Sequence, residues 1–187
     1  MNRTLAASQA RRLRQHLQRG GLIAYPTESC YGLGCLPKHA QALKKLVRLK
    51  KRPQHKGMIV IGDNMSRLQP LLQPLASADQ QNITQLWPAP TTLLLPASHK
   101  VLPLLRGKAR HQLAVRVPDH LGARKLCHIA NTPLVSTSCN RAGKRACTSE
   151  REARRQFGRD VMIIGGRIGT RRQPSIIIDW NSGQRLR

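Results

Sequence analysis

Apolar residues recur along the chain in two patterns, one typical of buried strands and the other of amphipathic helices. Short apolar runs bounded by Gly, Pro or polar residues predict strands, whereas apolar residues at every third or fourth position predict helices. We expect strands over residues 22–25, 57–61, 91–95, 113–117, 161–164 and 175–179, a strand that begins at Leu134 and opens into the polar stretch 136–140, and a short terminal strand ending at Arg187. We expect helices from a cap at Thr4 to Gly20, over 39–51, from Asp63 or Asn64 through Leu72, from Ser77 to Trp87 and Pro88, over 121–130 and over 149–157. The spacing from Ser77 to Gln80 predicts a capping box, and the polar, basic segment 99–111 predicts a loop.

The order of these elements indicates the fold class. Strand, loop, helix and strand follow one another over residues 22–61, which is the rhythm of a βαβ unit in a sheet with parallel pairs. Gly32 and Gly34 follow the first strand and predict a tight turn that approaches a ligand closely. The chain shows no internal repeat, and its 187 residues suit one domain with a sizeable core. We therefore expect a single α/β domain over residues 1–187 with seven or eight strands.

The charge of the chain points to a polyanionic partner. Lys and Arg total 33 against 8 Asp and Glu, which gives a formal net charge of +25. A field of this sign favours nucleic acid first and an anionic membrane surface second. So few acidic residues leave little material for a metal site rich in carboxylates. Aromatic residues make up 3% of the chain, so the core must be built from Leu, Ile, Val and Ala.

Targeting signals and cysteine usage suggest a cytoplasmic protein without a membrane segment. The N-terminus has no apolar signal region, and no apolar run reaches the length of a membrane span. Five cysteines without a CxxC pair suggest reduced thiols in a cytosolic protein. Cys30, Cys35 and His39 form at most a partial zinc set, so free cysteines are the favoured interpretation.

The stretch 134–140, Leu-Val-Ser-Thr-Ser-Cys-Asn, is the first candidate site. Two apolar residues give way to small polar ones, as where a buried strand opens into a ligand-binding loop at its carboxyl end. Ser136, Thr137, Ser138 and Asn140 could hydrogen-bond phosphate or carboxylate oxygens. Alternatively, these side chains cap the backbone of their own turn.

Cations supply the second candidate. Lys50, Arg52 and Lys56 surround a helix end and could clamp a triphosphate, or they could form a solvated basic helix end. Arg116 interrupts the apolar run 113–117, which contains no acidic residue, so a substrate carboxylate would suit it unless it lies on an exposed edge. The chain has no P-loop, no paired carboxylates and no nucleophile–base pair. A reaction here would depend on positioning and on neutralising negative charge.

Together these stretches resemble the YrdC-like threonylcarbamoyl-AMP synthases over nearly the whole chain and in the same order. The matching segments are residues 25–34 (YPTESCYGLG), 50–53 (KKRP) with Lys56, 87–92 (WPAPTT), 114–118 (AVRVP), 136–140 (STSCN), 174–179 (PSIIID) and the terminal Leu186 and Arg187.

The resemblance implies a fold and a reaction. The fold is a twisted mixed β-sheet with flanking helices and a concave basic face. The reaction joins L-threonine, bicarbonate and ATP into threonylcarbamoyl-AMP and releases pyrophosphate, with Mg²⁺ held on the phosphates mainly by phosphate and water. Partner proteins then transfer the threonylcarbamoyl group to an adenosine beside the anticodon of certain tRNAs.

The resemblance also implies roles for individual residues. Lys50, Arg52, Ser138 and Asn140 would form the catalytic set, and no side chain would ligate the metal. The residues expected at ATP are Lys50, Arg52, Lys56, Asn140, Thr148 and Arg187. Those expected at threonine are Thr27, Ser29, Arg116, Ser138 and Ser175, with Arg116 at its carboxylate.

Two rival functions remain open at this point. A non-catalytic protein could bind tRNA or double-stranded RNA with the basic concave face, although few aromatic residues are present for base stacking. A general ATP-binding regulator would share the phosphate clamp but would have no use for Arg116.

Overall fold

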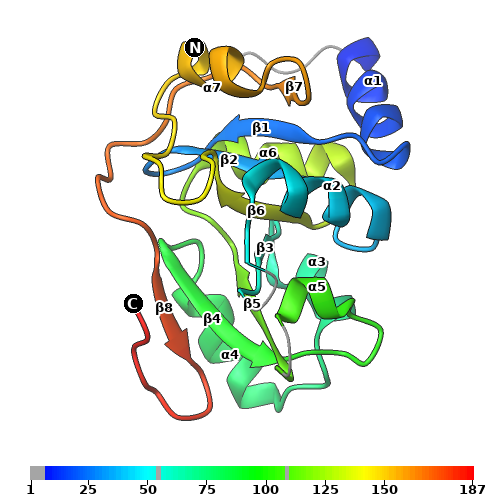
Figure 1. Ribbon diagram of the computed structural model, residues 1–187. Coiled ribbons are helices and arrows are strands. Elements are labelled where there is room, and N and C mark those ends of the chain that lie inside the picture. Colours follow the sequence, from blue (N-terminus) through cyan, green and yellow to red (C-terminus); the bar gives the residue numbers. More distant parts are fainter. Residues whose placement is uncertain (1–6, 54–55, 108–109) are drawn as a thin grey trace.

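The computed structural model describes residues 7–53, 56–107 and 110–187, so the expected cap at Thr4 lies outside the described residues. The helices are α1 (Ala7–Gln18), α2 (Ala40–Lys50), α3 (Met65–Leu68), the 3₁₀ turn η1 (Gln69–Leu71), α4 (Ser77–Leu86), α5 (Pro103–Arg106), α6 (Leu121–Ala130) and α7 (Glu150–Phe157). The strands are β1 (Ile23–Pro26), β2 (Tyr31–Gly34), β3 (Ile59–Ile61), β4 (Thr91–Pro96), β5 (Gln112–Arg116), β6 (Leu134–Ser138), β7 (Met162–Ile163) and β8 (Ile176–Asp179). Figure 1 shows their arrangement.

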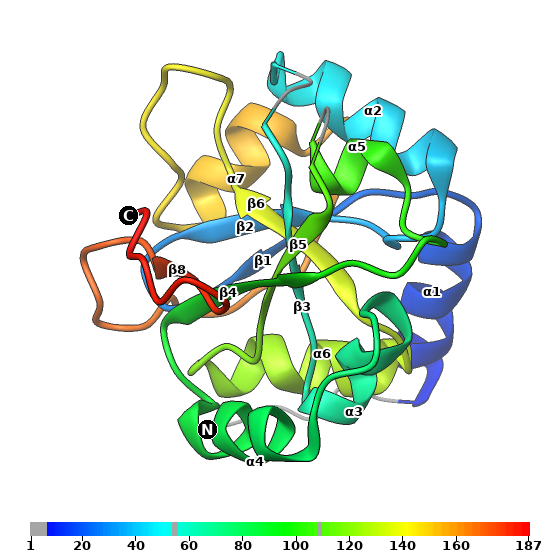
Figure 2. The same ribbon diagram turned by 90° about the horizontal axis from the view of Figure 1, so that it is seen from below.

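The strands form one mixed sheet in the order β7-β1-β2-β6-β3-β5-β4-β8. The pairs β1/β7, β3/β5 and β4/β8 are parallel, and the other neighbours are antiparallel. Figure 2 shows the strands crossing the molecule at successively different angles, which is the twist expected of a large sheet. The predicted α/β fold with a twisted mixed sheet is therefore confirmed.

The sheet buries both faces because its strands alternate between two apolar clusters. Ile23 and Tyr25 of β1 pack with α1 and α6, whereas Ala24 points into the larger cluster that includes α2. Figure 2 likewise shows α2 and α5 on one side of the sheet and α6 on the other. The helices thus hold the sheet rigid from both sides, and the candidate site forms at the strand ends.

The two glycines predicted to form a tight turn lie inside strand β2 instead. A Cβ on Gly34 would lie 2.3 Å from the carbonyl oxygen of Val135, and one on Gly32 would lie 3.2 Å from the hydroxyl of Ser136. The glycines therefore allow β6 to pass close to β2. The close approach that the structure shows is to the backbone and side chain of the neighbouring strand, and approach to a ligand stays a prediction.

Three smaller expectations also differ. The capping box expected at Ser77 is absent, because the helix cap makes no side-chain bond and Gln80 donates to the carbonyl of Leu75 instead. The expected loop over 99–111 contains the short helix α5. The expected terminal strand is reduced to an isolated bridge between Ile178 and Arg185. Among the described residues, no helix is long and apolar enough to span a membrane.

Candidate active site

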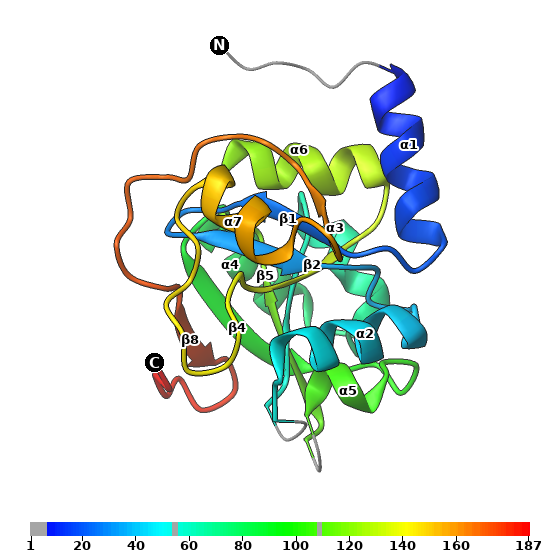
Figure 3. The ribbon, with the colours of Figure 1, turned by 45° about the horizontal axis from the view of Figure 1, so that its top comes forward.

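A cavity of about 530 Å³ gathers most of the predicted site residues. Its lining comes from strands in both halves of the sheet, from the 139–149 loop and from the 165–175 segment. Figure 2 shows the C-terminal end of the chain between these two stretches, and Figure 3 shows the same region from above. The lining includes hydroxyl groups and arginines: Thr27, Ser29, Ser136, Thr137, Ser138, Thr148 and Ser175, with Arg52, Arg116, Arg145, Arg172 and Arg187.

Arg116 reaches the cavity from the end of β5 and has a protein partner. Its Nη1 donates to Oε1 of Glu28 at 3.1 Å, and each side chain is 7% exposed. The backbone N–H of Asp119 donates to the same Glu28 oxygen at 3.0 Å. The turn between β1 and β2 therefore brings Arg116 an acidic partner that is far from it in the sequence.

The guanidinium of Arg116 still has donors to spare. Its Nε is buried and has no hydrogen-bond partner among the described residues. Burial lowers the pKa of Arg116, and Glu28 opposes that effect. A buried cation with an unsatisfied donor at a cavity wall favours an anionic ligand, and a carboxylate matches the fork of a guanidinium.

Lys50 is buried, at 3% exposure, and holds the 138–140 loop. Its Nζ donates to the carbonyl oxygen of Ser138, and to the carbonyl and side-chain oxygens of Asn140 at 2.8 and 3.0 Å. The side chain of Asn140 also accepts from the Ser138 hydroxyl at 2.7 Å and donates to the carbonyl of Lys144. Burial, followed by the charge of Arg52, lowers the pKa of Lys50 to about 8.

The two other predicted cations of this segment diverge. Arg52 lines the cavity, and its guanidinium is held by the carbonyl oxygens of Lys56 at 3.2 Å and Gly57 at 2.6 Å. Lys56 is exposed and does not line the cavity. Lys50 and Asn140 do not line the cavity either. The 50–56 segment and the 138–140 loop therefore meet as predicted, but Arg52 is the member of the segment that faces the ligand space.

The C-terminal residue, Arg187, also lines the cavity. Arg187 donates from Nε to the carbonyl of Ser175 at 3.1 Å and from Nη2 to its hydroxyl at 3.3 Å. The same hydroxyl lies 2.9 Å from that of Thr92. Burial lowers the pKa of Arg52, and the charge of Arg187 lowers it further. Burial also lowers the pKa of Arg187, and the charge of Arg116 lowers it further. These like charges lie close enough to repel one another, so a bound anion would relieve them.

The remaining predicted residues at the cavity wall differ in burial and in whether their hydroxyls already bond to other protein groups. The Thr27 hydroxyl donates to the carbonyl of Cys30 at 2.8 Å. The Thr148 hydroxyl accepts from Arg145 at 3.3 Å. Ser29 is half-buried, and Ser138 is exposed at the end of β6. These short polar side chains leave room in the cavity while offering hydrogen bonds to a ligand.

Three residues of the site were missed by the sequence reasoning. Glu28 had a usable signal, since it is one of eight acidic residues and stands between two predicted site residues. Arg145 and Arg172 had none, because they lie in irregular loops of a chain with 33 lysines and arginines. Their position at the cavity is visible only in the folded chain.

The side chains at this site offer few ligands for a metal ion. No group of three or more His, Cys, Asp or Glu residues within the described ranges could hold a metal ion. The cavity-lining residues of the described chain include no acid. The residues therefore do not fit a metal held by the protein, and we derive no step through Mg²⁺. The five cysteines are free, and burial raises the pKa of Cys30, which lines the cavity.

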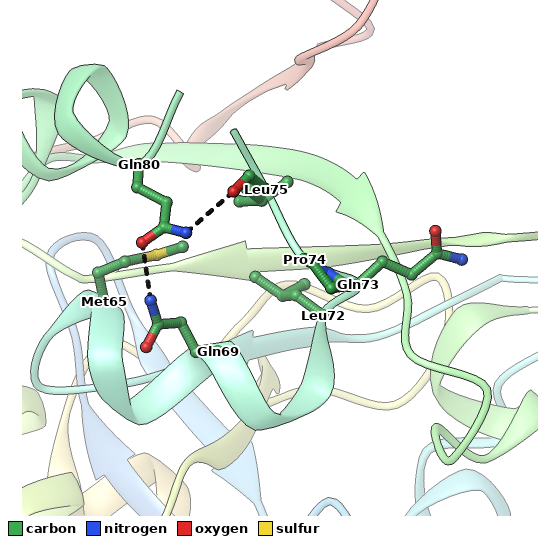
Figure 4. A pocket seen from close by; sticks show the side chains of 7 residues that line it. All are labelled: Met65, Gln69, Leu72, Gln73, Pro74, Leu75 and Gln80. Atoms are coloured by element: carbon green, nitrogen blue, oxygen red, sulfur yellow. Dashed lines mark hydrogen bonds between the residues drawn. The ribbon is translucent and has the colours of Figure 1, made fainter. Parts of the chain in front are cut away.

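A second hollow of about 200 Å³ lies beside α3 and α4 (Figure 4). Gln80 bridges its wall, donating to the carbonyl of Leu75 and accepting from Gln69, both at 3.0 Å. The described residues that line it are apolar or uncharged: Met65, Gln69, Leu72, Gln73, Pro74, Leu75 and Gln80. This hollow does not suit a charged substrate, so the larger cavity is the candidate site.

The fold and the cavity together define a class: an α/β protein with a cationic, hydroxyl-lined cavity for a small polyanionic ligand. Comparison with known proteins places it further. A family model described as telomere recombination, that of the Sua5/yciO/yrdC proteins, matches residues 15–187. The chain belongs to this family.

Several relatives carry the name threonylcarbamoyl-AMP synthase. One from Neisseria gonorrhoeae (strain ATCC 700825 / FA 1090) is 64% identical over 186 residues, covering 100% of this chain and 98% of the relative. One from Laribacter hongkongensis (strain HLHK9) is 51% identical over 187 residues, covering 100% of both chains.

A solved structure, P. abyssi Sua5 complexed with L-threonine, is 28% identical with a TM-score of 0.84. The match covers 96% of this chain and 53% of that one, so this chain spans about half the length of that protein. The predicted family and the prediction of an enzyme are confirmed, and the relatives' names favour this reading over a non-catalytic RNA-binding protein.

Proposed function

We propose that this chain is an L-threonylcarbamoyladenylate synthase that uses L-threonine, bicarbonate and ATP. The observation that carries the proposal is the single cavity in which Arg116, backed by Glu28, faces the same space as Arg52 and Arg187. One anion site backed by a buried acid and another made of mutually repelling arginines suit two ligands, an amino acid carboxylate and a polyphosphate. The names of the relatives and the threonine bound to P. abyssi Sua5 support this pairing.

Threonine is held at the Arg116 side in this proposal. The spare donors of Arg116 take its carboxylate, and Thr27, Ser29, Ser138 and Ser175 surround the rest of the molecule. The amine then attacks the carbon of dissolved CO₂ and loses a proton, or attacks bicarbonate with loss of water, and in either case gives a carbamate. No protein nucleophile takes part, because the amine itself forms the new C–N bond.

ATP is held at the opposite side. Arg52 and Arg187 contact phosphates, with Thr148 nearby, and a carbamate oxygen attacks the α-phosphorus as the bond to the β-phosphate breaks. Lys50 and Asn140 act indirectly in this scheme, because their bonds fix the 138–140 loop. Any Mg²⁺ accompanying ATP would be held by phosphate oxygens and water and would offset part of the phosphate charge. Catalysis thus consists of orienting the two substrates and stabilising negative charge.

The wider setting follows from the same proposal. The product passes to proteins that transfer the threonylcarbamoyl group to tRNA, and the net charge of +25 supports direct contact with RNA. We also propose a cytoplasmic location and a single domain over residues 1–187, since one continuous sheet joins strands from both ends of the chain.

The test is pyrophosphate release from ATP with L-threonine and bicarbonate supplied together or singly. We expect release that requires both, and its loss in Arg52→Ala with an unchanged circular dichroism spectrum. Binding of double-stranded RNA without such turnover would instead identify an RNA-binding module. Wild-type rates in Arg52→Ala would remove this arginine from the phosphate site.

A further inference from the structure

Two arginines at the cavity have no role in the scheme so far. Arg145 and Arg172 line the same space as Arg52 and Arg187, but they come from the two irregular stretches that cover it. Lys50, in contrast, is committed to the 138–140 loop. Arg52 and Arg187 together offset two of the negative charges of a triphosphate, so its outer phosphates can accept further cations.

Arg145 is held in a position from which it can change partners. Its Nη2 lies 2.5 Å from Oε1 of Glu152, and its side chain is 69% exposed. Glu152 is itself fixed, because its other oxygen accepts the backbone N–H of Thr148 at 2.7 Å. An ion pair this exposed contributes little to stability, so a multiply charged phosphate at the cavity mouth competes with it readily.

Arg172 sits on a backbone that is anchored while its own side chain is free. The 165–175 segment is tied down by the N–H of Gly169 on the carbonyl of Thr27 at 2.9 Å and by the Tyr31 hydroxyl on the carbonyl of Gly166 at 2.6 Å. The side chain of Arg172 is exposed and makes no hydrogen bond or ion pair with other described residues. It is therefore available to an anion without losing a protein contact.

We infer that Arg145 and Arg172 bind the β- and γ-phosphates of ATP and hold the pyrophosphate as it leaves. The inference rests on the proposed function. When the carbamate oxygen bonds to the α-phosphorus, the electron pair of the broken α–β bond stays on the β-phosphate oxygen. Negative charge on the leaving group therefore grows, and two guanidinium groups beside it stabilise that charge. Arg145 exchanges its Glu152 contact for the phosphate.

The experiment compares Arg145→Gln and Arg172→Gln with Arg154→Gln. Arg154 is a matched control: it pairs with Glu150 at 2.7 Å on α7, is 60% exposed and lies outside the cavity lining. Calorimetric titration with inorganic pyrophosphate measures binding directly, and steady-state turnover gives the KM values for ATP and threonine. We expect each cavity variant to bind pyrophosphate about tenfold more weakly and to raise the KM for ATP about tenfold, with the KM for threonine nearly unchanged.

The outcomes separate this inference from the proposed function. Unchanged pyrophosphate binding in Arg145→Gln and Arg172→Gln overturns the inference even if the wild type makes the adenylate. An equal loss in Arg154→Gln also overturns it, because the effect would then come from net charge. Weaker binding in the two cavity variants alone supports a pyrophosphate site, and absence of turnover in the wild type would then count against the proposed function only.

Discussion

Replacing Lys50 with methionine tests whether this lysine holds the 138–140 loop or touches the nucleotide. Methionine has a similar length and suits the buried position, but it cannot donate to the oxygens of Ser138 and Asn140. Three hydrogen bonds from a charged donor contribute roughly 5 kcal/mol in total. Burial of the ammonium and repulsion by Arg52 together cost roughly 3 kcal/mol, as the lowering of the Lys50 pKa from 10.5 to about 8 indicates. The net loss in the free energy of unfolding should therefore be roughly 2 kcal/mol.

Activity should fall more than stability suggests. The loop carries the Ser138 hydroxyl into the cavity, so its loosening should lower kcat/KM by about tenfold for ATP and threonine alike. Urea unfolding followed by tryptophan fluorescence gives the stability, and pyrophosphate release gives the kinetics. Lys44→Met, on the exposed face of the same helix, is the control. A rise in the KM for ATP alone would show that Lys50 contacts phosphate, and wild-type kinetics would refute both roles.

Four further outcomes are expected. Glu28→Ala leaves Arg116 buried without its partner and should cost about 3–5 kcal/mol of stability in urea unfolding. Arg116→Gln should raise the KM for threonine at least about tenfold while changing that for ATP little, and equal changes would mean that its ligand is misassigned. Gly34→Ala places a Cβ 2.3 Å from a carbonyl oxygen of β6 and should lower the free energy of unfolding by about 3 kcal/mol. Gly143→Ala, whose Cβ meets nothing within 4 Å, should lower it by only about 1 kcal/mol. The wild type should gain roughly 3 kcal/mol of stability from Lys50 as pH rises from about 8 to 10.5. Over this range the unfolded chain keeps the proton on Lys50, whereas the folded chain releases it. Lys50→Met should lack this gain.

Much of the fold was predictable because apolar periodicity marks buried faces directly. The strands over 91–95 and 113–117 were expected within a residue of their observed ends. Strand β2 was missed because its two glycines look like a turn, and only the closeness of β6 explains them. The capping of α4 failed for a related reason: local spacing at Ser77 does not reveal that Gln80 has a partner at Leu75.

The site was predictable in its residues and less so in their contacts. Arg116 was recognised as a charge that needs a partner, yet Glu28 lies 88 positions away in the chain and becomes its neighbour only through β1 and β5. Lys50 was identified as a cation of the site, but its burial and its three oxygen acceptors could not be foreseen from helical spacing. A sequence pattern gives the type of group, whereas pairing across the sheet decides what that group touches.

The most direct test of a cavity that joins two substrates follows isotopically labelled bicarbonate into product. With ATP and L-threonine both present, the labelled carbon should appear in one molecule that also contains the adenosine and the threonine. ATP consumed at the same rate without threonine, or label that never enters a nucleotide, would contradict the account.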